Sequence, residues 1–262
     1  MIKLVLAGIL CVVWFFLIHT VKMFRMYLVL VENKITFIRF VAAYCRTTLL
    51  NLIVPFKLGE IYRMIVYSRL TGNPGVGIAG VVVDRFFDTL ALVFILLPLH
   101  ALYPSGISAV SVFLFVFVAV VIFVFAMFPA AYKYLNKYII INRESRNSMT
   151  VLRWLEVLNN GYEYVRKLVS GRYALIALMS FGAWVLEGGL LFFIAGVLGI
   201  PFDAGDFSDY ITSILSTAHS ELQGKYTWFS IIVMAIFTVP ALAAALADRN
   251  RYRSKQVRSR EG

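Results

Sequence analysis

Residues 107–132 read ISAVSVFLFVFVAVVIFVFAMFPAAY and contain no charged side chain. A helix needs roughly 20 apolar residues to cross the hydrocarbon core of a bilayer. This run exceeds that length and predicts a membrane-spanning helix. Of the 262 residues, 61% are hydrophobic and 15% are charged, whereas soluble domains are about half apolar and about a quarter charged. Lipid is therefore the expected solvent for much of the chain.

Other apolar runs predict further spanning helices. They are residues 4–18, extending toward Leu30, then 75–99, 173–200 and 226–246. Lys3 before the first run is typical of a signal peptide, but no small-x-small cleavage pattern follows, so we expect a retained helix. The predicted fold class is all-α. It is a polytopic membrane helix bundle of about five spanning helices, with a broken re-entrant helix pair near residues 36–70.

The charges between the predicted spans orient the chain. Lys and Arg dominate residues 22–34, 133–172 and 249–262, whereas residues 100–106 carry neither and residues 201–224 carry only acidic groups. Basic segments beside spans favour the cytoplasmic side. We therefore expect a multi-pass protein of the cytoplasmic (inner) membrane, with the N-terminus outside and the C-terminus in the cytoplasm.

We expect one membrane domain with a short basic tail. The domain covers residues 1–248 and includes a cytoplasmic helical connector at about 133–172, and the tail covers 249–262. The formal net charge is +11, but no nucleic-acid reader motif accompanies it, so anionic lipid is the expected partner and nucleic acid is not. Cys11 and Cys45 are too few for a metal site or a disulfide framework. We predict no metal and no cofactor.

A break within residues 36–70 predicts the re-entrant pair. Residues 36–51 carry polar side chains on one stripe of a helix and apolar ones opposite. Pro55 disfavours a helical residue before it, Gly59 permits a sharp turn, and Glu60 suits the first turn of a second helix. Such breaks at membrane depth need protein or a water-filled cavity around them and mark binding sites in transporters. The alternative is an interfacial amphipathic helix followed by a loop.

Ionisable side chains gather around this break, and buried charges need partners. Five are basic and three are acidic: Arg39, Arg46, Lys57, Arg63 and Arg85 against Glu60, Asp84 and Asp88. Two positive charges are thus left unmatched. In one interpretation the ion pairs lock the broken helices to the bundle. In the other, the excess charge faces a cavity and binds a phosphate through planar guanidinium groups.

Glu187 lies near the middle of the predicted span 173–200 and has no cation one helical turn away. A carboxylate in this position is protonated, pairs with a distant Arg, or relays a proton. The adjacent Gly188 and Gly189 predict a close approach of another helix.

Motifs of catalysis are missing from the sequence. It contains no phosphate-binding Gly-rich loop with Lys, no nucleophile elbow and no zinc-protease motif, so transport or binding is expected in place of ATP hydrolysis or peptide chemistry. An intramembrane enzyme that uses Asp84 and Asp88 would have to depend on a divalent metal.

Two sequence motifs together resemble a known family. Residues 51–63, NLIVPFKLGEIYR, followed by residues 84–88, DRFFD, are similar to the transmembrane domain of lysylphosphatidylglycerol synthases, which also forms stand-alone flippase-like membrane proteins. The matching positions are Asn51, Pro55, Gly59, Glu60, Arg63, Arg85 and Asp88, and Asp84 stands where Glu is common. The family's Pro-Gly-Gly re-entrant motif is replaced by STAHSELQG at 216–224. The sequence contains no aminoacyl-transferring domain, so lysyl-lipid synthesis is not expected.

The resemblance implies binding and translocation of an anionic lipid, either a phospholipid or a polyprenyl-phosphate-linked glycan. The expected phosphate ligands are Arg39, Arg46, Lys57, Arg63 and Arg85. The supporting or proton-linked carboxylates are Glu60, Asp84, Asp88 and Glu187, and the hairpin break is formed by Asn51, Pro55 and Gly59. The alternative is a non-catalytic accessory subunit of a cell-envelope lipid or polysaccharide pathway, which binds lipid or a partner such as a glycosyltransferase without transport.

Overall fold

The computed structural model describes residues 2–33, 35–54, 58–102, 109–142, 146–203, 205–207, 210–211 and 221–261. These residues form helices and no strand, which confirms the all-α fold class. In chain order the elements are α1 (Ile2–Leu30), the 3-10 helix η1 (Val31–Asn33), α2 (Phe37–Ile53), α3 (Leu58–Thr71), α4 (Pro74–Leu102), α5 (Ala109–Asn142), α6 (Arg146–Leu198) and α8 (Glu221–Glu261).

Four of these helices are long and apolar enough to cross a bilayer. The candidate spans are Val5–Asn33 in α1 and η1, Ser111–Ile141 in α5, Ser170–Leu198 in α6 and Leu222–Asp248 in α8. The fifth predicted span corresponds to α4, a 29-residue helix whose first half carries Asp84, Arg85 and Asp88. The polytopic membrane helix bundle is thus confirmed, with a charged fifth long helix inside it.

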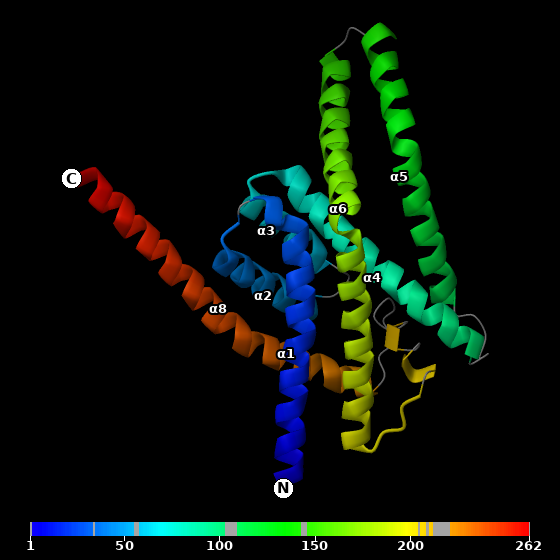
Figure 1. Cartoon of the computed structure of the whole chain (residues 1–262), viewed down its shortest axis with the longest axis vertical. Coiled ribbons are helices and arrows are strands. Elements are labelled where there is room, and N and C mark those ends of the chain that lie inside the picture. The colour runs from blue at the N-terminus through cyan, green and yellow to red at the C-terminus, as the bar shows by residue number, and fades with distance from the viewer. Residues whose placement is uncertain are drawn as a thin grey trace.

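The long helices alternate in direction (Figure 1). α1 and α6 run antiparallel and in contact through the middle of the molecule, while α8 crosses the bundle diagonally. The N-terminus and the end of α6 lie toward one end of the molecule, and the end of α5 and the start of α6 lie at the other. This arrangement has the alternation expected from the charge pattern, and the side that faces the cytoplasm stays a prediction.

α6 is one continuous helix of 53 residues. It joins residues 146–172 of the connector expected at about 133–172 to the following span, and residues 133–142 of that connector form the end of α5. The first part of α6 packs against α5. There the ring centroids of Phe125 and Phe128 lie 4.8 and 4.9 Å from the ring centroid of Tyr162. The backbone of α8 likewise stays helical through the basic tail to Glu261.

The predicted broken helix pair is present as α2 and α3. Val54 caps α2 in an extended conformation, as expected of the residue before Pro55. Gly59 lies against the last turn of α2, where an added Cβ would come within 2.4 Å of Asn51 Oδ1 and 2.6 Å of Asn51 Cα. Only glycine allows this approach. Pro55 and Lys57 themselves lie outside the described residues.

The pair is built into the bundle. α2 packs along α8, and α3 packs along α4. With 17 and 14 residues, the two helices are roughly 25 and 21 Å long, too short to cross a bilayer singly. An interfacial helix followed by a loop does not describe this arrangement, because the second segment is helical and buries Arg63, Val66 and Tyr67.

Small residues bring the central helices together. A Cβ on Gly189 of α6 would lie 2.9 Å from the indole of Trp14 in α1, and one on Gly188 would lie 3.1 Å from the ring of Phe207. The predicted close approach of another helix is therefore confirmed at Gly189, where the other helix is α1, and Gly188 instead faces Phe207. Trp14 also donates a 3.0 Å hydrogen bond from Nε1 to the carbonyl oxygen of Leu186, which fixes α1 against α6.

Candidate functional site

A buried arginine that we did not single out from the sequence lies at the centre of the charged residues. The Arg25 side chain, near the end of α1, is 1% exposed. Its Nε donates to Asp84 Oδ1 at 2.8 Å, and its Nη2 donates to Asp88 Oδ2 at 3.1 Å. Nη1 bonds the other Asp88 oxygen and donates to Ser180 Oγ at 2.9 Å. Arg25 therefore ties α1 to α4 and α6.

Arg63 and Arg85 join the same carboxylates. Arg63 Nη2 lies 2.9 Å and Arg85 Nη2 lies 3.1 Å from Asp84 Oδ2, and Arg85 is also 3.4 Å from Asp88. Glu60 lies 3.6 Å from both Arg63 Nη1 and Arg85 Nε. The charged cluster thus consists of Arg25, Glu60, Arg63, Asp84, Arg85 and Asp88.

The hairpin break holds one edge of the charged cluster. Asn51 Nδ2, in the last turn of α2, donates to Glu60 Oε1 at 3.0 Å. Gly59 permits this contact because it lets the first turn of α3 approach Asn51. The break residues therefore do more than turn the chain, since they orient a carboxylate of the cluster.

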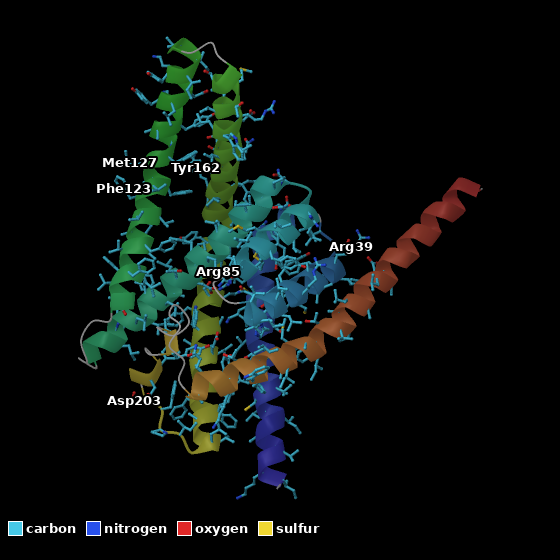
Figure 2. The ribbon with its side chains drawn as sticks, turned by 180° about the vertical axis from the view of Figure 1, so that it is seen from behind. Arg39, Arg85, Phe123, Met127, Tyr162 and Asp203 are labelled. Carbon is cyan, nitrogen blue, oxygen red and sulfur yellow. The ribbon has the colours of Figure 1, made fainter. Side chains whose placement is uncertain are left out.

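The charge balance of the cluster differs from the one expected. Three guanidinium groups meet three carboxylates. Arg39 pairs instead with Asp248 of α8, with Nε 3.5 Å from Oδ2, and Arg46 lies over the ring of Tyr62 at 5.6 Å from its centroid. Figure 2 shows Arg39 beside α8, away from the centrally placed Arg85.

The sequence predicts two more basic than acidic groups at this site. Among the described residues the cluster does not have this excess, because Arg39 and Arg46 lie elsewhere. Arg39 and Arg46 share a helical stripe with Asn51, but a stripe runs along the helix axis. Arg39 lies twelve residues before Asn51, roughly 18 Å along α2, so the two side chains reach different neighbours. Lys57, the remaining predicted base, is outside the described residues.

The cluster is open on one edge. Arg85 has 45% of its side chain exposed, whereas no other side chain of the cluster exceeds 14%. Among the described residues, Glu60 Oε2 and Arg63 Nε are buried and have no hydrogen-bond partner. Arg63 Nε is an unused donor and Glu60 Oε2 an unused acceptor, and the exposed Arg85 guanidinium is the group of the cluster that can donate to a phosphate from outside.

Glu187 has a partner at a distance that the sequence does not reveal. Lys22 Nζ of α1 lies 2.5 Å from Glu187 Oε2, and Tyr210 donates to Glu187 Oε1 at 2.9 Å. Lys22 also lies over the ring of Trp184, 5.3 Å from its centroid. Of the roles considered for Glu187, pairing with a distant cation is the one observed, and the cation is a lysine. Lys22 precedes Arg25 by one helical turn, so the pair adjoins the cluster along α1.

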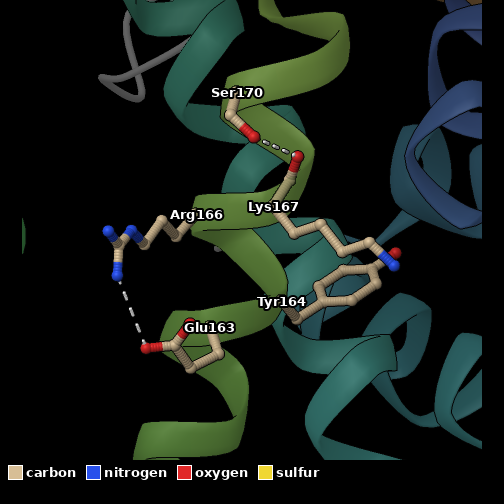
Figure 3. Close-up of a pocket in the computed structure, with 5 residues that line it drawn as sticks. All are labelled: Glu163, Tyr164, Arg166, Lys167 and Ser170. Atoms are coloured by element: carbon tan, nitrogen blue, oxygen red, sulfur yellow. Dashed lines mark hydrogen bonds and ion pairs between the residues drawn. The ribbon is translucent and has the colours of Figure 1, made fainter.

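A depression with a volume of about 550 Å³ lies on α6, apart from the charged cluster (Figure 3). Its lining residues are Glu163, Tyr164, Arg166, Lys167 and Ser170. Their charges are paired, with Arg166 at 3.9 Å from Glu163 and Lys167 at 3.5 Å from Glu32. Ser180, which bonds Arg25, lies ten residues beyond Ser170, roughly 15 Å along the helix. This depression contains no residue that we predicted for the site.

The family comparison covers the whole of the charged cluster. The family model described as the lysylphosphatidylglycerol synthase TM region matches residues 2–220, which include every helix from α1 to α6. It confirms the resemblance seen in residues 51–63 and 84–88. No curated protein and no solved structure matches the chain.

Proposed function

The chain belongs to the lysylphosphatidylglycerol synthase transmembrane family, and on that premise we propose that it binds an anionic lipid at the charged cluster and carries its head group across the membrane. Membership in this family makes it a membrane protein related to lipid handling. The proposed substrate is a phospholipid or a polyprenyl-phosphate-linked glycan, which share a phosphate ester attached to an apolar chain. The proposed location is the cytoplasmic membrane.

The depth of the cluster supports this function. Glu60 lies eleven residues before the end of α3 at Thr71, and Asp84 lies ten residues after the start of α4 at Pro74. At 1.5 Å per residue, both are roughly 15 Å from the α3–α4 turn. With that turn at the membrane surface, the cluster lies near the middle of a hydrocarbon core about 30 Å thick. Ionisable groups at such depth are costly and point to a path for a polar substrate.

Arg85 is the observation that carries the proposal. It is the exposed member of the cluster, and its contacts with carboxylates are 3.1–3.6 Å long. If a lipid phosphate takes Arg85, Asp84 keeps Arg25 and Arg63, and Asp88 keeps Arg25. Each buried carboxylate then still has a cation beside it. This matters because a buried carboxylate without a cation is strongly unfavourable. The described cluster can therefore exchange the three ion pairs of Arg85 for a ligand.

Movement of labelled lipid by protein reconstituted in liposomes tests this function. We expect the wild-type chain to move fluorescent phosphatidylglycerol between leaflets, and Arg85→Ala to reduce the rate by about tenfold or more, since a lost charge-assisted contact is worth about 1.5–3 kcal/mol. Arg69→Ala is the matched control, because Arg69 is an exposed arginine in the last turn of α3. Equal rates in the two variants would contradict the role of Arg85.

The enclosure of Arg25 favours a second function, a non-transporting accessory subunit. Arg25 is almost fully enclosed and fastens three helices together, as a fixed scaffold requires. Such a subunit would bind an anionic lipid, or a partner such as a glycosyltransferase, in a cell-envelope pathway. Retention of lipid by the purified protein, with no movement in liposomes for several anionic lipids, would select this function over the first.

A further inference from the structure

An apolar groove of about 530 Å³ lies beside the hairpin break. Leu52 and Ile53 in the last turn of α2 form one wall, and the other wall comes from the start of α8: Gly224, Thr227, Trp228 and Ile231. Ile53 is 56% exposed and Trp228 is 69% exposed. The groove therefore opens on the outer surface of the bundle, and large apolar side chains stand at its edge.

The groove and the charged cluster share one helical turn. Leu52 follows Asn51, whose side chain bonds Glu60 of the cluster at 3.0 Å. Neighbouring residues of a helix point about 100° apart. The last turn of α2 therefore directs a polar group toward α3 and the cluster, and apolar groups toward α8 and the groove. The groove is thus linked to Arg85 through Asn51 and Glu60, whose Oε1 lies 3.6 Å from Arg85 Nε.

The groove lies at hydrocarbon depth. Its α8 residues fall within the candidate span Leu222–Asp248. α2 runs antiparallel along this span, since Arg39 near the start of α2 pairs with Asp248 at the far end. Within a bilayer the material that meets such a surface is hydrocarbon. A volume of about 530 Å³ is in the range of sites for single small ligands, roughly 300–1,000 Å³, and suits one chain better than a partner helix.

We propose that this groove holds a hydrocarbon chain of the lipid whose phosphate binds at Arg85. The inference rests on the proposed function and extends it, because it makes the substrate an intact lipid and not a free head group. Recognition then has two parts, a guanidinium for the phosphate and an apolar channel for the chain. Only a molecule that has both occupies the whole site.

Gly224 offers a way to fill the groove. A Cβ added at this residue meets nothing within 4 Å, so Gly224→Leu adds an apolar side chain at the wall without displacing a neighbour. Gly196→Leu is the matched control. Gly196 also has nothing within 4 Å of an added Cβ, is exposed on α6 and does not line the groove. Both changes place the same side chain on a membrane-spanning helix.

The test measures binding of two probes to the full-length protein in detergent. One is long-chain phosphatidylglycerol, and the other is glycerophosphoglycerol, which has the same head group without chains. We expect Gly224→Leu to weaken binding of the long-chain lipid by about tenfold, equivalent to about 1.4 kcal/mol, and to leave glycerophosphoglycerol binding unchanged. Gly196→Leu should match the wild type for both probes. If Gly224→Leu lowers the unfolding temperature, Thr227→Leu fills the groove from the same helix.

The possible results separate the two proposals. Equal binding of the long-chain lipid by wild type, Gly224→Leu and Thr227→Leu overturns the groove and leaves the proposed function standing. Wild-type protein that binds neither probe overturns the proposed function. A change in oligomeric mass in Gly224→Leu, with lipid binding unchanged, assigns the groove to a protein contact and also overturns the inference.

Discussion

Arg25 and Arg85 carry the same guanidinium group, but their surroundings give them different tasks. Arg25 is enclosed and bonded to two carboxylates and a hydroxyl group, whereas almost half of the Arg85 side chain is exposed. The spacing of the sequence predicts the pairs Arg85–Asp88 and Glu60–Arg63, because each lies at i, i+3 on one helix. It does not predict Arg25, which lies 59 residues from Asp84 and meets it only when two helices pack.

Substitutions of Arg25 and Arg85 should lower the free energy of unfolding by different amounts. Arg25→Met leaves two buried aspartates short of a cation, and breaking a buried pair in this way costs about 3–5 kcal/mol. Arg85→Met removes a more exposed charge, and Asp84 and Asp88 keep Arg25. Thermal unfolding of both variants in detergent should therefore show a much larger loss for Arg25→Met. Equal losses would mean that Arg85 is as structural as Arg25.

The partner of Glu187, like Arg25, could not be predicted from the sequence because it lies on a helix that is distant along the chain. Its position in the middle of a span marks it as unusual, but its partner Lys22 lies 165 residues away. A sequence-based interpretation places Lys22 and Arg25 among the bases at the cytoplasmic end of a span. Their spacing of three residues at the end of an apolar run was the available signal that both face one neighbouring helix.

At the scale of elements, the α2–α3 hairpin decides where the charged cluster forms. Pro55 and Gly59 predict the break from local backbone rules, and the structure has a helix on either side of it. The polar stripe of α2 is also real, but its members divide between Asp248, Tyr62 and Glu60. Spacing predicts which residues share a face, and it does not predict how far along the helix each partner lies. For this reason the described residues of the charged cluster do not show the expected excess of positive charge.

Gly59→Ala should open the hairpin. The new methyl group would clash with the backbone and side chain of Asn51, so α2 and α3 must separate and the Asn51–Glu60 bond must lengthen. We expect a loss of about 1–3 kcal/mol in unfolding free energy, as for other overpacked contacts, together with slower lipid movement. Gly161→Ala is the control, since an added Cβ there meets nothing within 4 Å. Equal unfolding temperatures in the two variants would contradict the close packing.

For the whole molecule, apolar runs predict the fold class and the number of long helices. They do not predict where one helix ends and the next begins. The all-α membrane bundle follows from composition and run length, and four spans plus the charged α4 agree with it. The continuation of residues 146–172 into the following span as one 53-residue helix does not follow from them. Hydropathy separates polar from apolar windows, whereas a helix continues through both wherever no residue breaks it.

α8 extends the site beyond the family match. The match ends at residue 220, but α8 supplies Asp248 for Arg39 and one wall of the apolar groove. The phosphate-binding edge thus lies within the matched region, and the surface proposed for the lipid chain lies partly outside it. Variation in α8 is therefore expected to change which chain is accepted, while the cluster keeps the requirement for an anion.

Native mass spectrometry of the protein after mild extraction shows whether a lipid phosphate binds at Arg85. Wild-type protein and Arg69→Ala should retain a phosphate-bearing lipid at similar occupancy, because both keep the exposed edge of the charged cluster. Arg85→Ala should lose that lipid while its unfolding temperature stays close to that of the Arg69→Ala control. Undiminished retention by Arg85→Ala, or a wild-type protein that carries no phosphate-bearing lipid, would contradict the account.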